Sequence, residues 1–354
     1  MSVAGFMKTT DSNLDSTKKG GIYVTILDEK SSVLLDVIGL KKYFPVSDGF
    51  FRRKQLLKAV DDIHLTVRKG ETLGIVGESG CGKSTLAHLM TNLLKPTAGQ
   101  IIFDGIEMNK LSKRERRKKR QDIQMIFQDP FSSLNPRMKV FDIIAEPLRA
   151  HQVARGTHLK RQVNDLLQVV GLDPTYSDRY PHEFSGGQRQ RISIARAIAL
   201  KPKLIVCDEP VSSLDVSVQS QILNLLETLQ KEFHLTYIFI AHGLAAVKHI
   251  SDRIAVMYLG KIVELASTKE LFMRPLHPYT LGLISAVPIP DPTQRHLRKK
   301  ILLEGEIPNP VNPPSGCSFH PRCPFATEKC KNVVPQLREI SEGHVVACHH
   351  PRID

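Results

Sequence analysis

Residues 77–85, GESGCGKST, are the stretch that decides the fold. They fit the pattern GxxxxGK[ST] and directly follow the apolar run TLGIV at 72–76, which predicts a short buried strand. Apolar residues at helical spacing in KSTLAHLMTNLL, residues 83–94, predict a helix directly afterwards. Between a strand and a helix, this pattern is typical of a P-loop, whose glycines let backbone N–H groups surround phosphate. The sequence therefore predicts a nucleoside triphosphate site.

Two side chains of this loop have specific expected roles. Lys83 is expected to reach the β- and γ-phosphates, and the Ser84 hydroxyl is expected to ligate Mg²⁺. The chance alternative, an accidental glycine-rich turn, is disfavoured by the flanking strand and helix. The residues predicted to contact the nucleotide here are Gly77, Ser79, Gly80, Cys81, Gly82, Lys83, Ser84 and Thr85.

A second apolar run ends in two carboxylates. LIVCDE, residues 204–209, predicts a buried strand that ends at Asp208 and Glu209. Asp208 suits the Mg²⁺ shell, directly or through water, and Glu209 is placed to polarise an attacking water. A third buried strand is predicted at 237–241, and helical patterns such as 217–233 lie between the strands. This alternation predicts an α/β fold with a mostly parallel sheet.

The rest of the chain divides by composition. Residues 1–30 are polar, lack the apolar segment of a signal peptide and are predicted to form a flexible tail. Short amphipathic patterns joined by proline and glycine predict a helical insertion over about 129–185, within a main domain of residues 31–268. Residues 269–354 are rich in proline, which predicts a small, loop-rich C-terminal extension.

Charge and composition narrow the function classes. Lys and Arg (49) exceed Asp and Glu (36) by 13, which favours an anionic partner. Six cysteines are too few for a disulfide scaffold in a chain of 354 residues, and no apolar run approaches the length of about 18 that spans a bilayer. We expect a reduced, cytosolic and soluble chain.

FSGGQ at 184–188, followed by a helical pattern, narrows the class of nucleotide-binding protein. A Ser-Gly-Gly turn at a helix N-terminus makes a second anion-binding nest. A single bound ATP does not need two phosphate-binding nests from the same chain. We therefore expect two chains to meet head to tail, with the Ser-Gly-Gly nest of each chain facing the P-loop of the other. With these motifs the sequence resembles an ATP-binding-cassette (ABC) ATPase over roughly residues 33–265, with Phe184 in place of the more usual Leu.

The resemblance implies a P-loop NTPase (RecA-like) core and further site residues. Gln128 would be the Q-loop glutamine that senses Mg²⁺ and the γ-phosphate, and His242 would be the switch histidine at that phosphate. Phe44 would stack on adenine, with Tyr43 as its competitor for this role. Gly243 departs from the acidic residue often found after the histidine. The signature residues would be Ser185, Gly186, Gly187 and Gln188, and Asp215 would belong to the D-loop that crosses the interface.

Longer stretches make the resemblance more specific. The segments at 123–137, 179–200, 276–280 and 286–292 closely resemble the ATP-binding subunits of bacterial oligopeptide and dipeptide importers. Of the two ATPase types in those systems, the chain is more similar to the OppF type. The resemblance implies a peripheral subunit on the cytoplasmic face of the cell membrane that hydrolyses ATP to power peptide uptake. Its partners would be a second, related ATPase in a heterodimer, two transmembrane permease subunits and an extracytoplasmic peptide-binding protein.

Other functions stay open beside this one. Nickel chelates and glutathione are alternative cargoes, because close relatives handle them as well. A soluble ABC ATPase of DNA repair or translation is a further alternative, although such proteins usually carry two cassettes or a long coiled coil. A regulatory cassette that does not hydrolyse ATP is disfavoured by the presence of Glu209 and His242.

Four cysteines in the C-terminal extension predict a metal site. Their spacing, C-x5-C-x6-C-x17-C, differs from the CxxC of common zinc sites, but four thiolates in a segment with little core suggest a metal staple. The resemblance to importer ATPases implies a [4Fe–4S] cluster, with zinc or free thiols as alternatives. His320 and His344 are weaker ligand candidates. The predicted ligands are Cys317, Cys323, Cys330 and Cys348.

A basic run lies at 112–120, SKRERRKKR. We interpret it as a solvated helix face, with contact to lipid headgroups or nucleic acid as the alternative. No nucleic acid partner is expected.

Overall fold

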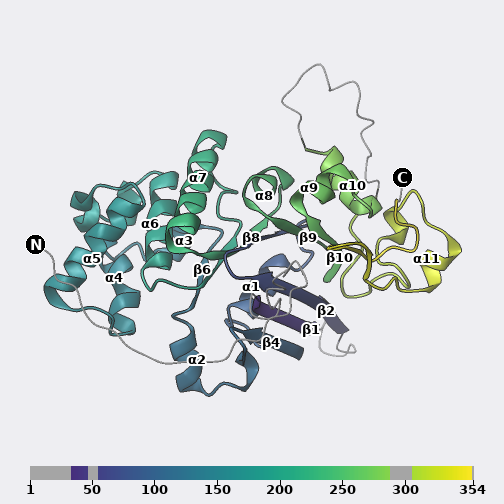
Figure 1. The fold of residues 1–354 in the computed structure, drawn as a ribbon, viewed down its shortest axis with the longest axis horizontal. Coiled ribbons are helices and arrows are strands. Elements are labelled where there is room, and N and C mark those ends of the chain that lie inside the picture. Colours follow the sequence, from purple (N-terminus) through teal and green to yellow (C-terminus); the bar gives the residue numbers. More distant parts are fainter. Residues whose placement is uncertain (1–32, 47–54, 288–304, 353–354) are drawn as a thin grey trace, which may run out of the picture. The chain divides into compact units, whose positions relative to one another are not determined.

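The computed structural model of the protein describes residues 33–46, 55–287 and 305–352. The predicted tail at 1–30 and part of the proline-rich stretch at 286–292 lie outside the described residues. The α/β class is confirmed, because strands of two sheets alternate with helices along the chain (Figure 1).

An eight-stranded sheet forms the centre of the fold. In sheet order its strands are β11 (Arg338–Ser341), β12 (His344–Val346), β10 (Lys261–Ser267), β9 (Arg253–Tyr258), β3 (Thr72–Val76), β8 (Thr236–Ala241), β7 (Leu204–Asp208) and β6 (Ile123–Ile126). The five strands from β9 to β6 run parallel, and the other three extend one edge in antiparallel pairing. The three strands predicted from apolar runs are β3, β7 and β8, and every residue in them is buried.

A smaller antiparallel sheet packs on one face of the central sheet. Its strands, in order, are β2 (Gln55–Arg68), β1 (Val33–Val46), β4 (Ala98–Phe103) and β5 (Ile106–Glu107). In β2 the side chains of Ile63, Leu65 and Val67 are buried and those of the alternate residues His64 and Thr66 are exposed, as expected for a strand with one face on a core.

Successive residues of the central strands point into two separate apolar cores. One core contains Val76, Cys207 and Phe239 together with the helices that follow β6. The other contains Ile75, Val206 and Ile238 together with helix α1 (Lys83–Met90) and the antiparallel sheet. Burial on both faces explains why these strands appear in the sequence as continuous apolar runs.

The segment between β6 and β7 is helical, as predicted for 129–185. It contains α3 (Pro130–Ser133), α4 (Val140–Ala150) and α5 (Gly156–Val169), followed by α6 (Gly186–Ile198). Helices α4, α5 and α6 pack on one another and lie together in Figure 1. The remaining α-helices are α2 (Lys113–Lys119), α7 (Val216–Phe233), α8 (Leu244–Ile250), α9 (Thr268–Met273), α10 (Pro278–Ser285) and α11 (Glu328–Asn332).

The C-terminal extension contains secondary structure that its proline-rich sequence does not indicate. Helix α10 has Pro278 in its first turn, where the missing N–H of proline costs no hydrogen bond. The β11–β12 hairpin joins the central sheet through β10. In β10 the buried carboxylate of Glu264 accepts bonds from the backbone N–H groups of Leu276 and His277, and it lies 2.7 Å from Nε2 of His344. The extension is therefore joined to the core by buried polar contacts.

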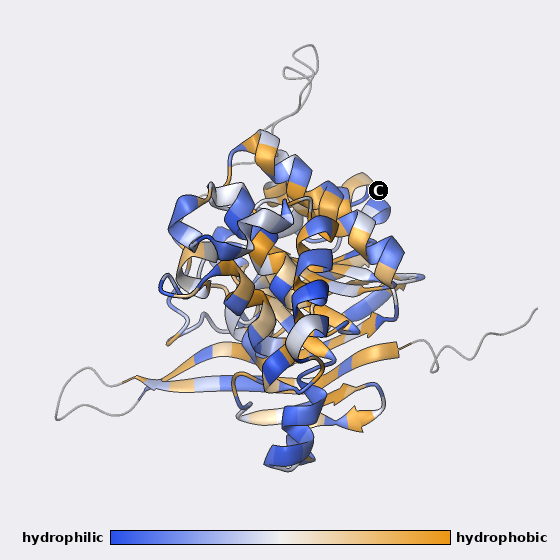
Figure 2. Cartoon of the chain, turned by 90° about the vertical axis from the view of Figure 1, so that its left-hand side faces the viewer, coloured by the Kyte–Doolittle hydropathy of each residue, from blue (hydrophilic) through white to orange (hydrophobic). Residues whose placement is uncertain are grey.

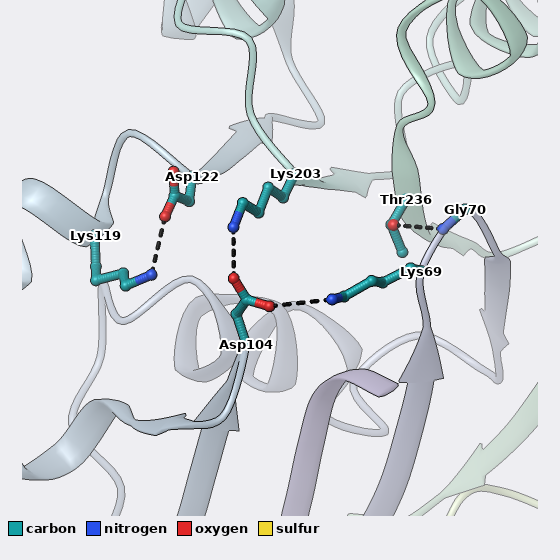
Figure 3. Close-up of polar contacts among 7 residues, drawn as sticks. All are labelled: Lys69, Gly70, Asp104, Lys119, Asp122, Lys203 and Thr236. Carbon is teal, nitrogen blue, oxygen red and sulfur yellow. Dashed lines mark hydrogen bonds and ion pairs between the residues drawn. The ribbon is translucent and has the colours of Figure 1, made fainter. Parts of the chain in front are cut away.

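Polar contacts also join the two sheets at the amino ends of β3, β7 and β8 (Figure 3). Asp104, in the turn between β4 and β5, pairs with Lys203 before β7 and with Lys69 after β2. The hydrogen bond from Lys203 holds the pKa of the Asp104 carboxyl below its ordinary value. The N–H of Gly70 donates to Oγ1 of Thr236 over 2.9 Å. All of these contacts lie at the amino ends of the three strands, and none of them involves a residue at their carboxyl ends.

The basic run is a solvent-exposed helix, as its interpretation as a solvated face requires, and that interpretation stays a prediction. Helix α2 has no buried residue, and Ser112 and Glu115 form a capping box at its start. Figure 2 shows this helix as a hydrophilic segment below the antiparallel sheet. In the part of the chain that the structure describes, we find no helix with the length and apolarity needed to cross a membrane.

Candidate nucleotide-binding site

The P-loop, residues 77–82, connects β3 to α1 at the carboxyl end of β3. Two of its glycines are required by close backbone contacts. A Cβ atom on Gly77 would lie 2.2 Å from the carbonyl oxygen of Met257, and one on Gly82 would lie 2.0 Å from that of Ala59. Gly82 also has a φ of 105°, a conformation that favours glycine. The loop is thus held in shape by the neighbouring strands β9 and β2.

Lys83, the first residue of α1, places its charge beneath this loop. Its side chain is buried, and Nζ donates to the carbonyl oxygens of Gly77 at 2.7 Å and Glu78 at 3.1 Å. The ammonium group and the N-terminal amides of α1 both favour a bound anion. Ser79 and Gly80 are exposed at the tip of the loop, Thr85 is half-buried, and burial raises the pKa of the Cys81 thiol.

Two predicted Mg²⁺ ligands lie together next to the loop. The Ser84 hydroxyl donates to Oδ1 of Asp208 over 3.2 Å, across 124 positions of sequence. Burial raises the pKa of Asp208, while the bond from Ser84 lowers it. A hydroxyl and a buried carboxylate are oxygen donors of the kind that Mg²⁺ prefers, so these two side chains fit the ion.

Gln128 and Glu209 form the next part of the site. Nε2 of Gln128 donates to Oε2 of Glu209 over 2.8 Å, so the predicted Q-loop glutamine lies against the predicted base. Glu209 has a φ of 48°, which is uncommon for a residue other than glycine, and its N–H donates to the carbonyl oxygen of Ile240 in β8. A carboxylate fixed in this way beside the predicted Mg²⁺ ligands can orient a water molecule and accept its proton.

His242 lies at the same edge of the sheet. It follows the last residue of β8 and is exposed. The parallel register pairs Val76 with Ala241 and Asp208 with Ile240, so the P-loop, the two acidic residues and His242 follow three adjacent strands. The structure therefore brings these separate motifs to one edge.

The two candidates for adenine stacking differ in their surroundings. The Tyr43 hydroxyl donates to Oδ1 of Asp61, and burial together with this carboxylate raises the pKa of Tyr43. Phe44 is half-buried, and Nζ of Lys42 lies 5.0 Å from its ring centroid. Because Tyr43 already has a polar partner and neighbours in a strand point to opposite faces, Phe44 is the better candidate. Its stacking on adenine stays a prediction.

The signature motif begins α6 with a capping box. Oγ of Ser185 accepts a bond from the N–H of Gln188 at 3.4 Å, and Oε1 of Gln188 accepts one from the N–H of Ser185 at 3.0 Å. Ser185 is exposed, whereas Phe184 is buried with its ring edge against Tyr176, 5.6 Å between centroids. This apolar site explains how phenylalanine replaces the usual leucine.

The D-loop lies beside the signature motif. A Cβ atom on Gly187 would lie 2.6 Å from Cγ1 of Val218, so the first turn of α6, which contains Gly186, packs closely on α7. Asp215 is the N-cap of α7 and is exposed. The next residue, Val216, has 79% of its surface exposed, which is unusual for an apolar residue. Ser185 and Asp215 therefore lie on adjacent helix ends that face solvent.

The four C-terminal cysteines line one small pocket together with His320, His349 and His350. All four cysteines are free thiols, and burial raises the pKa of Cys348 to about 11. Among the residues that the structure describes, no group of three or more His, Cys, Asp or Glu side chains is arranged to hold a metal ion. The placement of the thiols thus does not support the predicted [4Fe–4S] cluster.

An open groove of about 350 Å³, which no sequence pattern predicted, lies between α1, β6, α4 and α6. Leu93, just after α1, lines it and is 53% exposed. Each wall comes from a different segment, so no local pattern could have predicted the groove. Its apolar lining includes Leu93, Met125, Phe127, Pro147, Ala150 and Leu200.

Two protein-family models match the chain. The model described as "ABC transporter" matches residues 60–212, which include the P-loop, Gln128, the signature motif and Glu209. The model described as "Oligopeptide/dipeptide transporter, C-terminal region" matches residues 263–330.

Curated relatives match over most of the chain. "Oligopeptide transport ATP-binding protein AppF" of Bacillus subtilis (strain 168) is 54% identical over 318 residues, 89% of this chain and 97% of that protein. "Oligopeptide transport ATP-binding protein OppF" of Escherichia coli (strain K12) is 54% identical over 324 residues, 90% and 97% of the two chains. "Dipeptide transport ATP-binding protein DppF" of Haemophilus influenzae (strain ATCC 51907 / DSM 11121 / KW20 / Rd) is 47% identical over 325 residues, 91% and 98%.

Solved structures agree with this assignment. A dimeric, post-hydrolysis ATP-binding cassette, MJ0796 bound to ADP and Pi, superposes with a TM-score of 0.60 at 27% identity, covering 66% of this chain and 99% of that one. CbiO1 from Clostridium perfringens, part of the ABC transporter complex cbiONQ, gives 0.59 at 29% identity, covering 68% and 91%. The chain belongs to the ABC ATPase family, among the ATP-binding proteins of oligopeptide and dipeptide transporters.

Proposed function

We propose that this chain hydrolyses ATP to power the import of oligopeptides or dipeptides, as a peripheral subunit on the cytoplasmic face of the cell membrane. The observation that carries the proposal is the match of residues 263–330 to the C-terminal region of peptide transporters, on a chain that also has a complete cassette. The named relatives are oligopeptide and dipeptide transport proteins.

ATP binding follows from the charges of the P-loop. Lys83 and the amides at the start of α1 hold the phosphates, and Thr85 and the exposed tip of the loop cover them. Ser84, Asp208 and Gln128 would hold Mg²⁺, which neutralises the charge that develops on the phosphates. Phe44 stacks on the adenine ring.

Hydrolysis is assigned to Glu209. Its carboxylate accepts a proton from the attacking water as the oxygen bonds to the γ-phosphorus and the bond to ADP breaks. Gln128 holds this carboxylate in place through the 2.8 Å hydrogen bond. His242, directly after the adjacent strand β8, contacts the γ-phosphate. The backbone of Glu209 is itself fixed by the bond from its N–H to the carbonyl oxygen of Ile240 in β8.

The second half of each ATP site comes from another cassette. Ser185, Asp215 and Val216 are exposed on neighbouring helix ends, as a surface that becomes buried on assembly would be. The MJ0796 cassette bound to ADP and Pi is dimeric, which supports pairing of two cassettes. In an importer of this kind the partner is a second, related ATPase, so that closure depends on the γ-phosphate at each shared site.

The permease subunits dock in the groove beside α1. It lies between the helix that leaves the P-loop and the helices of 129–185, and β6 leads from it directly to Gln128. A permease segment seated there would therefore contact both the main domain, 31–268, and its helical insertion. Closure of two cassettes would move the two permeases together. An extracytoplasmic binding protein delivers the peptide to them.

The cargo is tested in the assembled transporter. Binding proteins loaded with oligopeptides, dipeptides, a nickel chelate or glutathione are added in turn to reconstituted complex, and ATP hydrolysis is measured. Stimulation by a peptide-loaded protein is expected. Stimulation by only the chelate or glutathione would replace the peptide assignment with one of these cargoes, and co-purification with ribosomes or DNA instead of permeases would contradict transport.

The [4Fe–4S] cluster stays a prediction on which no step above depends. The four thiols that would hold it share one pocket but are not arranged as ligands. Iron and sulfide analysis of anaerobically purified protein tests it. A cluster requires both elements, and protein that contains neither would rule the cluster out.

Replacing Glu209 with Gln is expected to leave Mg-ATP binding intact and to lower turnover by at least about 100-fold, because the amide cannot accept the proton. Nucleotide titration and phosphate release on the same preparation measure the two effects. E232Q, an exposed glutamate at the end of α7, is the matched control and should keep full activity. Undiminished hydrolysis by E209Q would remove Glu209 from its assigned role.

Replacing Ser185 with Glu places a negative charge where the partner's γ-phosphate is expected. Hydrolysis by the assembled complex should fall by about tenfold or more, whereas ATP binding by the isolated chain, which uses its own P-loop, should not change. T157E, at an exposed helix start, is the control. Full transporter-rate hydrolysis by a monomer, with S185E silent, would contradict the shared site.

Replacing Leu93 with Glu puts a charge among the apolar residues that line part of the groove and should weaken association with the permeases by about tenfold or more. The ATP affinity of the isolated chain should stay the same, since Leu93 lies beyond the end of α1. Co-purification and peptide-stimulated hydrolysis are measured, with L56E on the exposed part of β2 as control. Normal assembly of L93E would place the permease contact elsewhere.

A further inference from the structure

The C-terminal extension reaches the P-loop through one buried arginine. Arg322 lies in the turn His320–Arg322, and its side chain is 5% exposed. Nη1 and Nη2 donate to the two carboxylate oxygens of Glu78 at 2.7 and 3.0 Å, across 244 positions of sequence. A two-pronged bond of this kind between ions is among the strong and directional hydrogen bonds.

Glu78 is held at its backbone by the same part of the chain. Its N–H donates to the hydroxyl of Tyr279 over 2.9 Å, and Tyr279 is fully buried in α10. The Tyr279 ring packs against Tyr258 and Phe319, with centroids 4.8 and 5.4 Å away. The extension therefore fixes both the side chain and the backbone of one P-loop residue.

The position of Glu78 makes its charge important. Its carbonyl oxygen accepts a bond from Lys83, the lysine that serves the phosphates, so the carboxylate belongs to the phosphate-binding loop itself. An unpaired negative charge there would repel the phosphates of ATP, most strongly where little water screens it. The Arg322 guanidinium compensates this charge and turns the carboxylate toward the extension.

We propose that Arg322 is a positioning residue for ATP binding, through which the phosphate affinity of the P-loop depends on the cysteine-bearing extension. Cys323 follows Arg322 directly, and Cys317 lies five residues before it. Any change in this segment that displaces the arginine leaves Glu78 uncompensated. The proposal rests on ATP binding at the P-loop, which belongs to the family, and does not depend on the cargo or on a cluster.

The first test measures Mg-ATP affinity of the purified full-length chain with a fluorescent ATP analogue. R322Q is expected to raise the Kd about tenfold, because the Glu78 charge remains without its partner. The double variant E78Q/R322Q removes that charge and should return the Kd to within about threefold of the wild type. R338Q changes an arginine of the same extension that donates to the carbonyl of Cys348, and it should bind ATP normally.

These variants separate a positioning role from simple stabilisation of the fold. If the ion pair only fastens the extension to the core, R322Q and the double variant lower the thermal midpoint while the Kd stays within twofold of the wild type, which would overturn the proposal. Failure of the double variant to recover affinity would equally overturn the charge argument. Should R322Q not fold, R322K keeps the charge without the fork and is expected to raise the Kd by a smaller factor.

Hydrogen exchange gives a second readout, because coupling between two sites is reciprocal. Mg-ATP should slow exchange at the amides of His320, Arg322 and Cys323, which are bonded within this turn. The protection should be present in the wild type and R338Q and absent in R322Q. Equal protection in R322Q would contradict transmission through the arginine, whatever the stability of the variant.

Discussion

The parallel pairing of β3, β8 and β7 is the constraint on which the site depends. It places Val76 beside Ala241 and Asp208 beside Ile240, so that three loops far apart in sequence leave the sheet at one edge. The strands are buried on both faces, and a shift of register by one residue would exchange their two apolar cores. The geometry of the reacting groups is thus set by hydrophobic packing well below them.

Charge is concentrated at this edge and balanced within the chain. Lys83 is buried against carbonyl oxygens, Asp208 is buried beside Ser84, and Glu78 is paired with Arg322. Such groups are costly to bury unless they are paired or hydrogen-bonded. Each of these three charges has a partner in the chain. With Glu78 paired, the ammonium group of Lys83 and the amides at the start of α1 can attract phosphate without opposition from an unpaired carboxylate.

Local motifs made much of the site predictable, and contacts between distant segments made the rest unpredictable. The P-loop, β7, β8 and the helices after β6 follow from apolar periodicity and glycine pattern, and family resemblance supplied Gln128 and Ser185. The groove at Leu93 and the Arg322–Glu78 pair have no local signal, since each joins segments that only the fold brings together. The four cysteines show the reverse case, in which a sequence signal is present but the described residues do not form the predicted site. Their spacing in the sequence does not determine how their thiols are oriented.

Burial divides the nucleotide site into two kinds of surface. Lys83 and Asp208 are buried and held by the chain's own backbone and side chains, whereas Ser185 and Val216 face solvent. If the pocket were completed within one chain, Ser185 and Val216 would not need to be exposed. Covering an exposed apolar side chain such as Val216 is favourable, because it removes apolar surface from water. The proposed head-to-tail assembly accounts for this division, since the exposed half would then act on the nucleotide of a neighbouring cassette. Under this proposal hydrolysis would depend on assembly, whereas the Arg322–Glu78 pair would act on the half of the site that lies within the chain.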